Sequence, residues 1–217
     1  MIKTDVNLHA FMDAQRPERL DDLIAQIQDE IAEVGLPAFL RTGYTSGKHR
    51  FKDACYLPDD SSETIANHIY GIYEYSEMTQ ISGLPLDLWV VREYLQPQSF
   101  FTAFDGLPIS REVRIFCEQG IATQWQPYWP EHAIADCRHH AEPLPDDWRD
   151  RLAELNDISY DDLAHLKDAS ELATRIEGMH KYDWSIDWLW TEARGWVCID
   201  MAEKHRSYKS PDIQAFV

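Results

Sequence analysis

The sequence lacks a long apolar run and an apolar N-terminal core, and each absence excludes a class of protein. No stretch approaches the roughly 20 apolar residues that a helix needs to span a bilayer. The N-terminal stretch MIKTDVNLHAFMDAQRPERL contains no uninterrupted apolar segment of the kind found in a secretory signal. The sequence therefore predicts a cytoplasmic protein with no membrane partner.

Closely spaced cysteines are also missing. The four cysteines, Cys55, Cys117, Cys137 and Cys198, are far apart, and none belongs to a CxxC or CxxH pair. This spacing argues against a zinc knuckle or a dithiol redox motif. Buried, reduced thiols of a cytosolic protein are the expected alternative.

Basic residues are scarce, with 20 Lys and Arg against 38 Asp and Glu, and the formal net charge is −18. Such a charge repels phosphate backbones and anionic membranes, so nucleic acid is not expected as a partner. A basic protein or an amine-bearing substrate could be attracted by this negative charge. The 217 residues, 44% hydrophobic and 12% aromatic, are enough for one large folded domain or two small lobes that share a cleft.

Hydrophobic periodicity predicts an α+β organisation without repeats or Pro/Gly/Ser-rich linkers. Helices are expected at 17–34, 63–80, 146–156 and 161–180, and strands at 38–43, 52–57, 87–95, 111–117, 121–127, 183–191 and 195–201. The first helix is bracketed by Pro17 near its start and Gly35 just past its end. The order of elements divides the chain into an N-terminal helical segment (1–37), a small α+β lobe (38–86) and a larger α+β lobe (87–217).

A basic loop, residues 41–52 with the sequence RTGYTSGKHRFK, follows the first predicted strand. It combines small residues with four cations, Arg41, Lys48, Arg50 and Lys52. A flexible glycine-containing loop flanked by Arg and Lys can wrap a polyphosphate through its backbone N–H groups and its charges. It is not a Walker loop, because GxxxxGK[ST] does not occur. An ordinary basic surface turn would have the same composition, but in so acidic a chain the local inversion of charge favours an anion-binding role.

An acidic hairpin closes the second predicted lobe. Its two Trp-rich strands carry Asp187 and Asp200 at facing or nearly facing positions, among apolar neighbours. Two buried carboxylates repel one another, so they must share a proton or bind a cation. Magnesium, which takes a few carboxylates together with phosphate oxygens and water, suits such a pair. The alternative is that strand alternation turns both aspartates toward solvent.

A third pattern lies in the strand SREVRIF. Glu112 and Arg114 are two residues apart, so they share one face while Val113 and Ile115 point to the other. Considered without the other patterns, these charges would be explained by a cross-strand ion pair. The aromatic segment WQPYW at 125–129 is expected in the core or over a cleft, and an aromatic platform for a substrate is the alternative.

Taken in order, these patterns resemble the ATP-grasp superfamily. The strings VVREYL, PISREVRIF, PYW, DWLWT and WVCID are similar to motifs of a small phage-type clade related to peptide and amino-acid ligases. The string KDA at 52–54, with the separation of Asp187 and Asp200, is similar to the eukaryotic cell-division-cycle family that assists initiation-factor assembly. The likeness covers roughly residues 39–210. It implies an ATP-grasp fold, with two α+β lobes holding the nucleotide in a cleft between antiparallel sheets.

The resemblance also implies cofactors and residue roles. ATP and magnesium are the expected ligands, with Asp187 and Asp200 as metal ligands. The expected catalytic cations are Arg114, at the reacting γ-phosphate, and Arg41, in the place of a phosphate-binding lysine. The remaining expected nucleotide contacts are Lys48 at the phosphates, Lys52 at a phosphate or on the adenine side, Glu93, Tyr94 and Leu95 at the adenine hinge, and Glu112 near the ribose or phosphates.

Two departures from the family pattern stand out. The usual acid-x-Asn ending reads Asp200-Met201-Ala202, so one metal ligand is missing, and Glu203 or His205 would have to replace it. The N-terminal substrate domain of full-length ligases has no counterpart here, so substrate binding is expected to be built differently or supplied by a partner protein.

These features favour an ATP- and magnesium-dependent carboxylate–amine ligase of the peptide or amino-acid type, acting through an acyl-phosphate. No protein nucleophile is needed, which agrees with the lack of a Ser/His/Asp or Cys/His signature. An ATP-binding assembly or interaction module without turnover is the main alternative. A small-molecule kinase on the same scaffold is a third.

Overall fold

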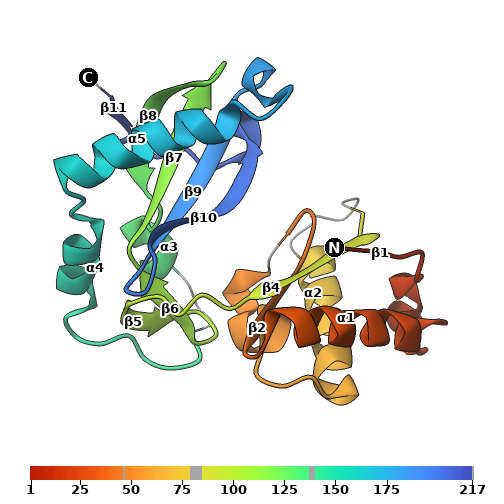
Figure 1. The fold of residues 1–217 in the computed structure, drawn as a ribbon. Helices are drawn as coiled ribbons and strands as arrows, with labels where there is room; N and C mark the ends of the chain where they lie inside the picture. Colours follow the sequence, from red (N-terminus) through yellow and green to blue (C-terminus); the bar gives the residue numbers. More distant parts are fainter. Residues whose placement is uncertain (46, 79–84, 137–139, 217) are drawn as a thin grey trace. The chain divides into compact units, whose positions relative to one another are not determined.

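The structure is a computed structural model of the chain and describes residues 1–45, 47–78, 85–136 and 140–216 (Figure 1). It is a mixed α+β protein with antiparallel sheets, divided into two compact units. The first unit comprises Met1–Leu95, Phe104–Leu107 and His139–Glu142, and the second comprises Gln96–Ala103, Pro108–Arg138 and Pro143–Val217. Each unit has its own sheet and is described by itself.

The first unit is a four-stranded antiparallel sheet with two main helices. The strand order is β1 (Ile2–Lys3), β4 (Leu88–Glu93), β2 (Ala38–Thr42) and β3 (Tyr56–Leu57). The helices are α1 (Leu20–Val34) and α2 (Ser62–Met78). Short helical turns occur at η1 (Leu8–Asp13), η2 (Lys48–Arg50) and η3 (Phe51–Cys55).

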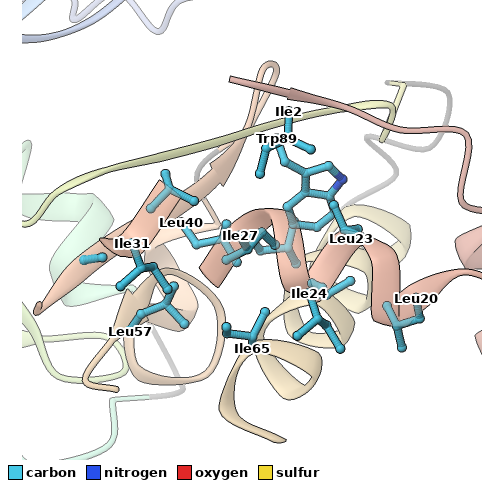
Figure 2. Close-up of a cluster of buried hydrophobic side chains, with 14 of the residues drawn as sticks. Ile2, Leu20, Leu23, Ile24, Ile27, Ile31, Leu40, Leu57, Ile65 and Trp89 are labelled. Atoms are coloured by element: carbon cyan, nitrogen blue, oxygen red, sulfur yellow. The ribbon is translucent and has the colours of Figure 1, made fainter. Parts of the chain in front are cut away.

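Helix α1 buries one apolar stripe in the core of this unit. Its buried side chains recur at helical spacing and meet residues of α2 and of the sheet in one cluster (Figure 2). The labelled members are Ile2, Leu20, Leu23, Ile24, Ile27, Ile31, Leu40, Leu57, Ile65 and Trp89. The predicted helix at 17–34 is confirmed from Leu20 onward. It begins late because Arg19 has a left-handed φ of 61°, and it stops at Gly35, where φ is 85°.

Strand β4 fixes where the first unit ends. It lies between β1 and β2, and Trp89 and Val91 are buried in the same core as α1. The sequence predicted a separate N-terminal segment at 1–37, a small lobe at 38–86 and a large lobe that begins at residue 87. In the structure all these residues belong with β4, and the division falls after Leu95. Long-range strand order, which local patterns do not encode, causes the difference.

The predicted strand at 52–57 is wrong for residues 52–55. A π-helical turn, η3, occupies Phe51–Cys55, and only Tyr56–Leu57 is strand. Phe51, Ala54 and Cys55 are buried at helical spacing, and the Asp105 carboxylate accepts the N–H groups of Lys52 and Asp53 at 3.0 and 3.3 Å. Burial on one side and a carboxylate cap at the start favour the helical form.

The second unit has a five-stranded antiparallel sheet. The strand order is β10 (Gly195–Glu203), β9 (Trp184–Thr191), β7 (Glu112–Glu118), β8 (Ile121–Pro127) and β11 (Gln214–Ala215). Helix α5 (Tyr160–Thr174) lies across β7, β8 and β9 (Figure 1). Shorter elements are β5 (Ser99–Ala103) and β6 (Leu107–Ser110), which pair with each other, α3 (Glu131–Ala135), α4 (Trp148–Asn156), η4 (Met179–Lys181) and η5 (Lys204–Arg206).

The remaining predicted elements are found close to their expected bounds. The strands at 87–95, 111–117, 121–127, 183–191 and 195–201 are confirmed within a few residues. The helix at 161–180 ends early, at Thr174, and Gly178 has a left-handed φ of 82°. Ser61 caps α2 by accepting the N–H of Thr64 at 3.2 Å, while residues 79–80 lie outside the described part of the chain. Within the described residues, no helix has the length and apolar character needed to cross a membrane.

Candidate functional site

A polar row crosses four strands of the second unit. Asp200 lies opposite Asp187, Asp187 opposite Arg114, and Arg114 opposite Gln126. Residues directly opposite one another in antiparallel strands project to the same face of a sheet. The polar row, defined as Asp200, Asp187, Arg114 and Gln126, therefore lies on a single face.

Alternation explains why this face is polar. The flanking residues Val113, Ile115, Ile186 and Trp188 point the other way and pack into one hydrophobic cluster with Leu166 of α5. Burying these side chains under α5 turns the residues between them to the opposite face. The predicted sharing of one face by Glu112 and Arg114 follows from the same alternation.

Arg114 and Asp187 form a bidentate ion pair. Arg114 donates from Nε to Oδ1 of Asp187 at 2.7 Å and from Nη2 to Oδ2 at 2.8 Å, and the two side chains are only 12% and 6% exposed. The guanidinium carbon also lies 4.8 Å from the ring centroid of Tyr128. Burial opposes the charge of Arg114, but the hydrogen bonds and charge of Asp187 outweigh it, so the pKa of Arg114 is raised.

A β-bulge brings Asp200 into the row. The pairing passes from Cys198 opposite Trp188 to Asp200 opposite Asp187, which leaves Ile199 as the extra residue. Without this irregularity, Ile199 would lie opposite Asp187. Asp200 is half-buried, and its Oδ1 accepts the N–H of Met201 at 3.1 Å. The expectation that the two aspartates face each other is thus met through a bulge.

The third metal ligand of the family pattern has no counterpart in the described residues of β10. Ala202 occupies the position two residues after Asp200, and Glu203 instead pairs with Arg206 at 3.0 Å. Across the described ranges no group of three or more His, Cys, Asp or Glu side chains is arranged to hold a metal ion.

The chain returns across the polar row after β10. This crossing segment, residues 207–210, is held by several hydrogen bonds. The Ser207 and Ser185 hydroxyls are 2.5 Å apart, and the Tyr208 carbonyl accepts from Arg114 at 3.4 Å and from Gln126 at 3.3 Å. The Ser210 N–H donates to the Gln126 side-chain oxygen at 2.8 Å. These contacts help to bury Gln126 and Ser185.

Comparisons with known proteins do not indicate a family for the chain. No model of a known protein family matches the chain, and no curated protein matches it either. The case for function therefore rests on the residues themselves.

The cations of the basic loop differ in their partners within the first unit. Arg50 forms ion pairs with Glu74 and, at 3.6 Å, with Asp53. Arg41 donates from Nε to the carbonyl of Thr42 at 3.1 Å. Arg50 is therefore held by two carboxylates of the same unit.

Lys52 extends over Gly106. A Cβ placed on Gly106, where φ is 72°, would lie 2.5 Å from Cε and 2.9 Å from Nζ of Lys52. The absence of a side chain at Gly106 thus makes room for the lysine. Lys48 follows Gly47, whose left-handed φ of 61° starts the turn η2.

The expected hinge residues lie where β4 ends: Glu93 is its last residue, and Tyr94 and Leu95 follow it. The N–H of Tyr94 donates to the carbonyl of Pro37 at 3.3 Å, so one of the backbone groups expected to meet adenine is already used. Burial, then the neighbouring Tyr56 and Cys55, raise the pKa of Tyr94 to about 12. Glu93 is exposed and lies opposite Ala38 in the ladder, and Leu95 is the last residue before the division.

Two of the described cysteines, Cys55 and Cys117, lack the properties of a nucleophile. Burial raises the pKa of both Cys55 and Cys117 to about 12, which leaves almost no thiolate at neutral pH. The prediction of buried thiols is confirmed for these two residues and is wrong for Cys198, which is exposed. Cys137 lies outside the described part of the chain.

Sequence reasoning missed Gln126, Tyr128 and Tyr208. The turn after Glu118 would by itself align Arg114 with Trp125; a register shift between Phe116 and Cys117, which no local pattern signals, places Gln126 opposite Arg114 instead. The carbonyl of Tyr208 had no signal either, because a backbone acceptor on a crossing segment leaves no pattern in the sequence. The cross-strand ion pair given as the alternative for Arg114 is found, but its partner, Asp187, depends on the strand order β9-β7 and was not anticipated.

Proposed function

We propose that the chain is an ATP- and magnesium-dependent carboxylate–amine ligase built on an ATP-grasp fold, with the nucleotide held between two α+β lobes. The observation that carries the proposal is the polar row: two carboxylates at directly opposite positions, beside a buried arginine, on one face of an antiparallel sheet. Magnesium takes carboxylates together with phosphate oxygens and waters, so Asp187 and Asp200 fit its donor preference. The ion would neutralise charge on the transferring phosphate.

The arginine has a second task in this proposal. Arg114 holds both oxygens of Asp187, which fixes the orientation of that carboxylate toward a ligand. Its raised pKa keeps it charged throughout the working pH range. Such a preorganised cation can stabilise negative charge that develops during phosphoryl transfer, in the way expected for the reacting γ-phosphate.

The proposed reaction balances without a protein nucleophile. A carboxylate oxygen of the donor substrate attacks the γ-phosphorus of ATP, the bond to the bridging oxygen breaks, and ADP leaves. The neutral amine of the acceptor then attacks the acyl carbon, inorganic phosphate leaves with the former carboxylate oxygen, and the extra proton on nitrogen passes to solvent. Amide, ADP and phosphate are the products, and the protein acts by positioning and charge.

The first unit would supply the rest of the nucleotide site. Arg41, Lys48 and Lys52 are proposed to bind the phosphates. The chain at Glu93, Tyr94 and Leu95 is proposed to meet the adenine, through groups other than the Tyr94 N–H that Pro37 occupies. Glu112, buried on the face of the polar row, is proposed to act near the ribose or phosphates.

Substitution of Asp200 tests the proposal most cleanly, because Asp187 and not Asp200 is the carboxylate that holds Arg114. An affinity of about 10 μM would add about 2.7 kcal/mol of stability at about 1 mM Mg-ATP. We expect Mg-ATP, and not Mg-GTP, to raise the melting temperature, and Asp200→Asn to lose most of this shift. Glu192→Gln, exposed in the turn of the same hairpin, is the control and should keep it. An equal shift in Asp200→Asn and Glu192→Gln would show that the metal assignment is wrong.

A binding module without turnover is the second candidate, and two observations favour it. Arg114 already occupies both oxygens of Asp187, and Ala202 stands where the third metal ligand is expected. Release of ADP by the purified protein in mixtures of amino acids separates the two candidates. Tight Mg-ATP binding without ADP release in any mixture would favour the binding module, whereas ADP release that depends on an added amine would favour the ligase.

A further inference from the structure

The second unit contains a cavity of about 680 Å³ that no nucleotide contact explains. Its walls come from the chain after β8, from α3 and α4, and from the crossing segment with the residues that follow it. Its functional side chains are Trp129, His132, Asp136, Arg149, Tyr208 and Asp212. Small-molecule sites commonly have volumes of about 300 to 1,000 Å³, so the cavity is large enough for an amino acid or a short peptide.

The charges of the cavity wall are unbalanced. Arg149 is paired with Glu131 at 2.7 Å, which leaves Asp136 and Asp212 as additional carboxylates. Neither aspartate takes part in a salt bridge within the ranges that the structure describes. The charges of Arg149 and Glu131 cancel, so Asp136 and Asp212 give the wall a net negative charge. A cation is attracted to it.

Aromatic rings add a second feature that suits an ammonium group. The rings of His132 and Tyr208 meet edge to face with centroids 5.8 Å apart, and the Trp129 indole lines the same cavity. Ring faces attract ammonium groups, and the attraction grows as water is excluded. A carboxylate wall with aromatic rings favours an amine over a phosphate.

The cavity and the polar row share part of their structure. Gln126 belongs to the row and also lines the cavity, and its side chain holds the crossing segment at Tyr208 and Ser210. The Tyr208 carbonyl accepts from Arg114 as well, so the cavity wall is tied directly to the Arg114–Asp187 pair. A ligand in the cavity would lie beside the proposed site of phosphoryl transfer.

We propose that this cavity binds a small molecule with two ammonium groups, such as a diamino acid or a peptide that begins with a basic residue. Its role as the amine acceptor rests on the proposed ligase function. Binding itself requires only the cavity, Asp136, Asp212 and the rings, so it should occur without nucleotide.

The test uses the full chain without ATP or magnesium, with L-lysinamide as the probe. Isothermal titration should show saturable binding of lysinamide that weakens as salt increases, with weaker binding of the monocation alaninamide and none of glutamate. Asp136→Asn and Asp212→Asn should each weaken lysinamide about fivefold, the equivalent of one partly exposed ion pair. Asp168→Asn, which removes an exposed carboxylate from α5, is the charge-matched control and should leave the affinity unchanged.

The outcomes are distinct from those of the Mg-ATP test. If Asp168→Asn weakens lysinamide as much as Asp212→Asn does, the amine is attracted to the acidic surface in general and the cavity proposal is overturned. The cavity proposal would also be overturned if lysinamide showed no saturable binding at concentrations up to about 10 mM. Lysinamide binding in a protein that fails to bind Mg-ATP would support the cavity and refute the acceptor role.

Discussion

Two side chains, Arg114 and Asp187, concentrate the electrostatics of the second unit. Each is a charge removed from water, and the bidentate geometry with the Tyr208 carbonyl and the Tyr128 ring compensates for that removal. The sequence indicated both residues as functional but assigned them to different partners. Local spacing shows that a charge faces a given side of a strand, whereas the partner depends on which strand lies next to it.

Breaking this pair should be costly. Asp187→Asn leaves the Arg114 guanidinium charged and buried without a carboxylate, so we expect a loss of about 3 to 5 kcal/mol in the free energy of unfolding. Urea denaturation followed by circular dichroism measures the loss. Asp168→Asn, exposed on α5, should change the free energy by less than about 0.5 kcal/mol.

A double variant checks the cause. If the loss comes from the uncompensated charge, Arg114→Met with Asp187→Leu should recover much of it, since an apolar pair of similar size removes both charges. Failure of the double variant to exceed Asp187→Asn in stability would contradict this explanation and assign the loss to packing.

At the scale of elements, predictions succeeded where a pattern is local. The helix at 17–34 has a regular apolar stripe, and the hairpin at 183–201 has alternating strands with a tight turn, so period and turn residues were sufficient. They failed at Phe51–Cys55, where the helical form depends on the Asp105 carboxylate, far along the sequence. The bulge at Ile199 and the path of residues 207–210 depend in the same way on neighbours from other strands.

Helix α2 and the turn η3 make a close contact that can be tested through Gly71. Gly→Ala within a helix normally stabilises by about 0.5 to 1 kcal/mol. A Cβ at Gly71, however, would lie 2.3 Å from the carbonyl oxygen of Asp53 and 3.1 Å from its carbonyl carbon. Backbone atoms cannot rotate away as a side chain can, so we expect Gly71→Ala to destabilise the protein by about 1 to 3 kcal/mol.

The midpoint of urea denaturation measures this effect, and Asn67→Ala provides the control. Asn67 is exposed on the same helix, so its replacement should change stability by about 0.5 kcal/mol or less. Stabilisation by Gly71→Ala would mean that α2 and η3 are not packed against each other as described. Such a result would also weaken the case for a fixed basic loop, since η3 contains Lys52, the last cation of that loop.

At the scale of the whole molecule, the charge of −18 acts on both units. Repulsion among like charges favours the expanded, unfolded chain, while surface ion pairs such as Arg16–Asp21 act in the opposite direction. Each exposed pair contributes only about 0 to 1 kcal/mol, so the general repulsion should dominate. Added salt screens both, because the Debye length falls from about 30 Å at 0.01 M to about 8 Å at 0.15 M.

We therefore expect the melting temperature to rise by several degrees between 0.01 and about 0.15 M sodium chloride at pH 7.5, measured without nucleotide. About 1 kcal/mol of reduced repulsion corresponds to roughly 2 to 4 °C for a chain of this size. The rise should shrink as the pH approaches the isoelectric point of about 4.7, where the net charge vanishes. A melting temperature that falls with salt at pH 7.5 would mean that specific ion pairs outweigh the repulsion. Exposed pairs such as Arg16–Asp21 would then be the first to examine by the same titration, because salt screens the buried Arg114–Asp187 pair least.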